Sequence, residues 1–101
     1  MTELVKESFD AAHYFNTPEG VIALLNDALE SGHAPYIANA LGVAARSEGM
    51  TRMAAKTGVN RQALYTALSE NGNPTLETLL KVMSALGLRL KFEIADIAEA
   101  A

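Results

Sequence analysis

The chain has 101 residues, half of them hydrophobic, with a net charge of −4 and no cysteine. This length predicts one domain, and the lack of cysteine excludes disulfides, thiolate nucleophiles and cysteine-based metal sites. No apolar run approaches the roughly 20 residues of a membrane span, and the start MTELVKESFD lacks the order of a signal peptide, so we expect a cytoplasmic protein.

The first half of the chain predicts an arm and two helices. Residues 1–16 are weakly patterned and are expected to form an N-terminal arm that packs on the domain. Thr17 is a suitable cap for a helix over 18–31, with proline at its first position and Gly32 at its end. A second amphipathic helix is predicted over about 35–46.

Two short helices follow, with a tight turn between them. Thr51 is the expected cap of a helix over 52–57, and Gly58 follows where a left-handed residue is needed. Asn60 is the expected cap of the next helix, over 61–68. This order predicts a helix-turn-helix, the motif that places its second helix in the major groove of DNA.

The side chains of this segment fit the motif. Ala54 is the small residue that allows close packing, and the apolar positions that would hold the two helices are Met53, Val59, Leu64 and Leu68. The polar positions of the second helix are Arg61, Gln62, Tyr65 and Thr66. Arginine and glutamine can bond guanine and adenine edges, and tyrosine and threonine suit phosphates or thymine methyls. The expected phosphate contacts are Thr51, Lys56 and Asn60. A purely structural helical hairpin remains the alternative interpretation.

The last part of the chain predicts a helix and a strand. Thr75 is the expected cap of a fifth helix that continues through Leu86 and stops at Gly87. In the following LRLKFEI, apolar and charged residues alternate, which is the pattern of a half-buried strand. The sequence therefore predicts an all-α, five-helix domain over 17–87, followed by a short C-terminal β-strand and tail over 88–101.

That strand needs a partner, because one strand alone does not form a stable sheet. We expect it to pair across a two-fold axis in a homodimer or with another protein. The dimer-interface residues would be Leu88, Leu90, Phe92 and Ile94. The alternative is an extended tail that lies on its own helices.

Charge is unevenly distributed along the chain. Residues 1–45 hold one base and six acids (−5), residues 46–91 hold seven bases and three acids (+4), and residues 92–101 hold three acids (−3). Because the local field decides what a surface attracts, an acidic total does not argue against DNA binding by the basic middle of the chain.

The sequence resembles a known family. From FDAAHYFNTPE to the segment GMTRMAAKTGVNRQALYTALSENGNPTLETLLKVMSALGLRLKF, over roughly residues 9–92, it is similar to the addiction-module antidote proteins. The resemblance implies a helix-turn-helix domain of the lambda-repressor kind, an operator on double-stranded DNA and a RelE-type toxin partner. It also implies repression of the protein's own operon.

Other chemistry finds no support in the sequence. The two histidines, His13 and His33, lie twenty residues apart and have no metal-ligand spacing, and no serine has a recognisable base and acid beside it. We therefore expect no metal, no cofactor and no catalytic residue. Two further functions remain open: a prophage-type repressor without a toxin, and a toxin-masking module that does not bind DNA.

Overall fold

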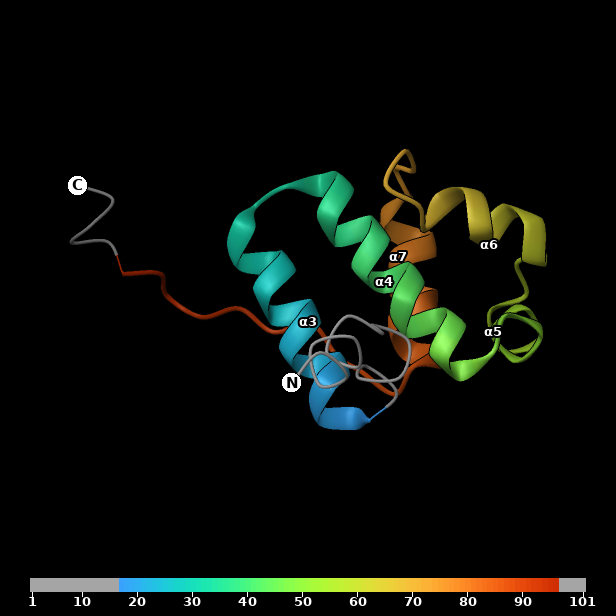
Figure 1. Ribbon diagram of the computed structural model, residues 1–101, viewed down its shortest axis with the longest axis horizontal. Coiled ribbons are helices and arrows are strands. Elements are labelled where there is room, and N and C mark those ends of the chain that lie inside the picture. Colours follow the sequence, from blue (N-terminus) through green and yellow to red (C-terminus); the bar gives the residue numbers. More distant parts are fainter. Residues whose placement is uncertain (1–16, 97–101) are drawn as a thin grey trace, which may run out of the picture.

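The computed structural model describes residues 17–96 (Figure 1). Five α-helices lie in this range, and they are α3 (Pro18–Ser31), α4 (Ala34–Glu48), α5 (Met50–Thr57), α6 (Arg61–Ala67) and α7 (Leu76–Ala85). The predicted all-α architecture of five helices is confirmed. The expected N-terminal arm, residues 1–16, and the end of the tail, residues 97–101, lie outside the described residues.

Three of the four predicted N-caps are confirmed. Thr17 Oγ1 accepts from the Gly20 N–H (3.1 Å), Asn60 Oδ1 from the Ala63 N–H (2.8 Å), and Thr75 Oγ1 from the Thr78 N–H (3.1 Å). Each bond satisfies one of the free donors at a helix start.

The fourth cap prediction, Thr51, is wrong. Helix α5 begins at Met50, with Gly49 before it at φ 111°. The Gly49 N–H donates to the Ala45 carbonyl at the end of α4, and the Gly49 carbonyl accepts from the Met53 N–H (both 2.9 Å). One glycine therefore ends one helix and starts the next, and Thr51 lies inside the first turn of α5.

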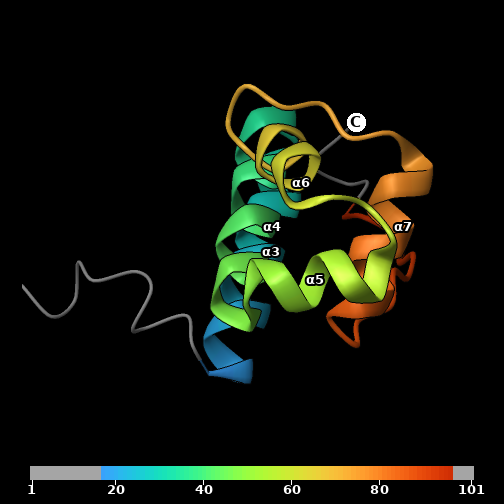
Figure 2. The same ribbon diagram turned by 90° about the vertical axis from the view of Figure 1, so that its right-hand side faces the viewer.

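Helix α4 lies at the centre of the domain. It contacts α3 on one side and α5 and α6 on the other, and α5 also contacts α7 (Figures 1 and 2). The largest fully buried side chains come from α4, α5, α6, the residue after α6, and α7, and they are Leu41, Met53, Leu64, Leu68 and Val82. The core therefore joins the two short helices to the rest of the domain.

Helices α4 and α6 approach each other closely at Gly42. A Cβ atom added to Gly42 would lie 2.1 Å from the carbonyl oxygen of Leu68, the residue that caps the end of α6. Real Cβ atoms essentially never lie this close to a backbone oxygen, so only glycine fits without a backbone shift. The sequence alone does not distinguish Gly42, because a glycine inside a helix gives no indication of which neighbour it faces.

A side-chain hydrogen bond links α3 to α4. Tyr36 Oη donates to Asp27 Oδ2 at 2.5 Å. The carboxylate acceptor stabilises the protonated hydroxyl and raises the pKa of Tyr36 above the ordinary 10.0.

The expected C-terminal β-strand is not formed: residues 88–96 are irregular, and residues 17–96 contain no strand. Helix α7 ends at Ala85. Gly87, two residues later, has φ 75°, and the Leu88 N–H donates to the Met83 carbonyl at 2.8 Å. This Schellman arrangement turns the chain off the helix. The prediction fails for the single chain because the alternating pattern has no second strand to pair with.

The Gly42 contact leads to a stability prediction. Gly42→Ala should lower the free energy of unfolding by about 2 kcal/mol, because the overlap with Leu68 outweighs the roughly 1 kcal/mol that alanine gains in helix propensity. Denaturant unfolding of both proteins tests this. Asn39→Ala, in the same helix, is the control and should leave stability unchanged or slightly raised. A Gly42→Ala protein as stable as the parent would show that the two helices can separate at no cost.

Candidate nucleic-acid interface

Helices α5 and α6 are joined by a turn of three residues, Gly58, Val59 and Asn60. Gly58 has φ 77° and its N–H donates to the Ala54 carbonyl, so it has the predicted left-handed conformation at the end of α5. Thr57 is buried, and its hydroxyl donates to the Met53 carbonyl (2.7 Å) and accepts from the Val59 N–H (3.1 Å). Together these bonds fix the entry of the chain into α6.

The sequence alone does not indicate the role of Thr57. A threonine at the end of a short helix is compatible with solvent exposure, and only the contact with Val59 identifies it as part of the turn. The sequence feature that marks Thr57 is a hydroxyl residue directly before a turn glycine, and this feature is too common to identify a residue that fixes a turn.

The two faces of α6 differ sharply. Leu64, and Leu68 just beyond the helix, are fully buried, whereas the four residues predicted to face DNA are exposed. These four are Arg61, Gln62, Tyr65 and Thr66. The structure thus brings them together on the exposed side of α6.

Arg61 and Tyr65 interact on this surface. The guanidinium carbon of Arg61 lies 6.0 Å from the centroid of the Tyr65 ring, one helical turn away. This is the outer limit of a cation–π contact, so the ring biases the direction of the arginine without holding it tightly. No carboxylate within residues 17–96 forms an ion pair with Arg61, so its charge is available to a ligand.

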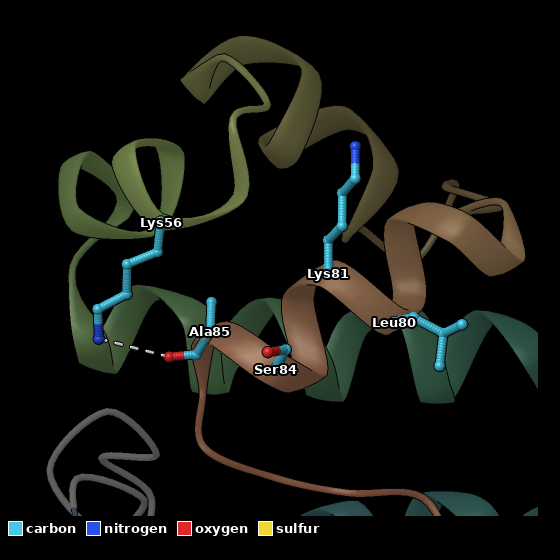
Figure 3. A pocket seen from close by; sticks show the side chains of 5 residues that line it. All are labelled: Lys56, Leu80, Lys81, Ser84 and Ala85. Atoms are coloured by element: carbon cyan, nitrogen blue, oxygen red, sulfur yellow. Dashed lines mark hydrogen bonds between the residues drawn. The ribbon is translucent and has the colours of Figure 1, made fainter.

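The cations of α5 are engaged differently. Arg52 and Lys56 both pair with Glu48 Oε2, at 3.6 and 3.5 Å. Lys56 Nζ also lies 3.5 Å from the Ala85 carbonyl at the end of α7, beside a shallow hollow that Leu80 and Lys81 help to line (Figure 3). The structure therefore directs Lys56 toward α7 and does not bring it beside the outer face of α6.

The other two expected phosphate contacts lie at helix starts. Asn60 caps α6, and Thr51 lies exposed in the first turn of α5. The caps of short surface helices leave backbone N–H groups for an acceptor such as a phosphate oxygen. Contact of either residue with DNA stays a prediction.

Residues 17–96 contain no group of three or more metal-ligating side chains placed to hold an ion. No helix in that range is long and apolar enough to cross a membrane.

Comparison with known proteins identifies the family. Residues 5–94 match the family described as "Probable addiction module antidote protein". An uncharacterized protein of Haemophilus influenzae is 40% identical over 93 residues, which cover 92% of this chain and 95% of that protein. No solved structure matches the chain.

The fold thus defines the class of protein: an all-α domain in which two short helices are joined by a tight glycine turn. The chain belongs to the family of probable addiction-module antidote proteins, as the resemblance of its sequence implied. Membership in this family implies a non-enzymatic role and a toxin as partner.

The capping bond of Asn60 leads to a second prediction. Asn60→Ala should lower the free energy of unfolding by about 1 kcal/mol, because the Ala63 N–H loses its acceptor, whereas Asn60→Ser should retain most of the stability. Denaturant unfolding measures both. Equal losses in the two variants would show that Asn60 acts through contacts other than the cap.

Proposed function

We propose that this protein is a DNA-binding antitoxin that represses its own operon as a dimer and neutralises a small RelE-type toxin. The observation that carries the DNA-binding part is the outer face of α6. It presents arginine, glutamine, tyrosine and threonine to solvent while Leu64 is fully buried beneath them. The first turn of the second helix is the part that reaches base edges in this motif, and it holds Arg61 and Gln62.

The local charge supports the same surface. Residues 49–68 contain three bases, Arg52, Lys56 and Arg61, and no acid. With two of these paired to Glu48, Arg61 is the cation best placed to meet a phosphate-rich ligand or a guanine edge. DNA reading by this surface therefore depends mainly on α6.

We propose that the toxin binds on the other side of α4, over α3. Residues 17–45 contain three acids, Glu19, Asp27 and Glu30, and no lysine or arginine. Ile22 and Leu29, seven residues apart on the same helix, are 42% and 49% exposed. Toxins that cut RNA need basic surfaces to hold it, so an acidic face with apolar side chains is a suitable cover.

DNA reading by Arg61 is tested with two substitutions. Arg61→Ala should weaken binding to the operator by about 1–3 kcal/mol and relax base preference at one position. Arg61→Lys keeps the charge but not the bidentate geometry, so it should lose base preference while retaining binding to unrelated DNA. Gel shifts on the gene's own promoter and on scrambled DNA measure both. Equal losses on both DNAs in the Arg61→Ala protein would contradict the assignment of Arg61 as a base reader.

Toxin binding by α3 is tested with the product of the neighbouring small open reading frame. Glu19→Lys with Glu30→Lys should lower the association rate more than it raises the dissociation rate, and added salt should slow association of the parent protein. Asp27 is left intact because it bonds Tyr36. Glu70→Lys with Glu77→Lys makes the same charge change outside α3 and is the control.

Co-expression decides between the antitoxin and a plain repressor. If the neighbouring product is toxic alone and harmless with this protein, the antitoxin function holds. If it is harmless alone, or does not bind this protein, the protein is a repressor without a toxin. Binding of toxin without any shift of promoter DNA would indicate a masking module.

A further inference from the structure

The segment after α7 exposes large apolar side chains that touch little of their own domain. Phe92 is 103% exposed and Ile94 is 90% exposed, and Leu90 is 40% exposed. The segment runs away from the five helices (Figure 1). Leu88 differs from them, because it packs against the core and donates its N–H to Met83. The free part of the segment therefore begins after Leu88, and we call residues 89–96 the C-terminal arm.

The arm has a symmetric order of residue types. Phe92 is flanked by Lys91 and Glu93, and these are flanked by Leu90 and Ile94. Read in either direction from Phe92, the order is aromatic, charged, aliphatic, with the two charges of opposite sign. A segment of this kind is complementary to a second copy of itself running antiparallel, which is what an interface with two-fold symmetry requires.

We propose that the arms of two copies pair antiparallel with Phe92 at the two-fold axis. In this register Phe92 faces its own copy, Leu90 faces Ile94, and Lys91 faces Glu93, with the last two pairs each occurring twice. All six exposed apolar side chains then lie on one face and opposite charges lie directly across from each other, which stabilises neighbouring strands. This inference rests on the proposed dimer and specifies how it forms.

The other registers that keep apolar residues facing each other are less favourable. With the axis at Leu90, Arg89 would face Lys91. With the axis at Lys91 or at Glu93, a charged residue would face its own copy. The Lys91 register would also pair Ile94 with Leu88, which is already held by its own domain. Like charges directly opposite each other destabilise a strand pair, so the Phe92 register is selected.

The domain offers a surface to cover the apolar face of the pair. A hollow of about 500 Å³ lies between α7 and the start of the arm, and Leu80, Met83, Leu88 and Leu90 are among its lining residues. Leu80 is 50% exposed there. Two paired strands are marginally stable by themselves, and packing on a helix supplies the burial that they lack. A second copy therefore supplies the strand that pairs with the arm, and the apolar face of the pair then fills the hollow.

The register is tested by a cysteine scan, which the cysteine-free parent chain makes unambiguous. Directly opposed residues have Cα atoms about 4.5–5.5 Å apart, within the range of a disulfide. Phe92→Cys should therefore form a disulfide-linked dimer on mild oxidation. Lys91→Cys and Glu93→Cys place their copies about 8 Å apart, and Leu90→Cys and Ile94→Cys further still, so each alone should remain unlinked. A mixture of the Leu90→Cys and Ile94→Cys proteins should form the linked heterodimer.

Charge reversal tests the same register without cysteine. Lys91→Glu or Glu93→Lys alone should raise the dimer dissociation constant about tenfold, and the double variant should restore it, because opposite charges again face each other. Sedimentation of the full chain measures the constant. No rescue in the double variant would overturn the proposed pairing.

The outcomes separate this inference from the proposed function. If the wild-type protein sediments as a dimer but the single-cysteine variants cross-link most at position 90, 91 or 93, or equally at all positions, the Phe92 register is overturned while the dimer stays in place. A wild-type protein that sediments as a monomer would overturn the dimer itself. An arm that becomes protected from proteolysis only when the toxin is bound would assign the arm to that partner. Promoter gel shifts report on DNA binding independently of all these results.

Discussion

The approach of α4 to the end of α6 at Gly42 is the contact on which the rest of the structure depends. Because the Leu68 carbonyl occupies the space of a missing side chain, α6 can lie against the central helix. That position buries Leu64 and Leu68 completely, and by the geometry of a helix it turns the opposite side of α6 outward. The exposed polar residues on the outer face of α6 are therefore a consequence of a backbone contact made on the opposite, buried side of that helix.

The central helix also separates the two charged parts of the domain. Helix α3 packs against α4 on one side, and α5 and α6 pack against it on the other (Figure 1). Helix α3 contains acids without a base, and the two short helices contain bases without an acid. A small domain thus presents surfaces of opposite sign without bringing them into contact, and its net charge describes neither of them.

Much of this arrangement follows from local sequence. The caps at Thr17, Asn60 and Thr75 and the turn at Gly58 are short-range features, so the residues within one helical turn determine them. The outward residues of α6 could also be assigned, because a period of 3.6 residues sorts a helix into faces once the buried leucines are recognised.

The features that could not be predicted depend on neighbours distant in sequence. Gly42 is meaningful only beside Leu68, and the direction of Lys56 depends on Glu48 and the end of α7. The cap at Thr51 was misassigned because α4 continues two residues further than expected and passes directly into α5. The strand predicted after α7 is absent from residues 88–96, because an alternating pattern forms a strand only beside a second strand, and residues 17–96 contain none.

The junction at Gly49 has a consequence for how the length of this chain can change. Because this one residue separates α4 from α5, an insertion or deletion there would change the direction of α5 relative to α4, and α6 would move with α5. The connection between α6 and α7 has eight residues, 68–75, and most of them could absorb a change in length. Variation in length among homologous chains should therefore concentrate after α6, while the spacing from α4 to α6 stays fixed.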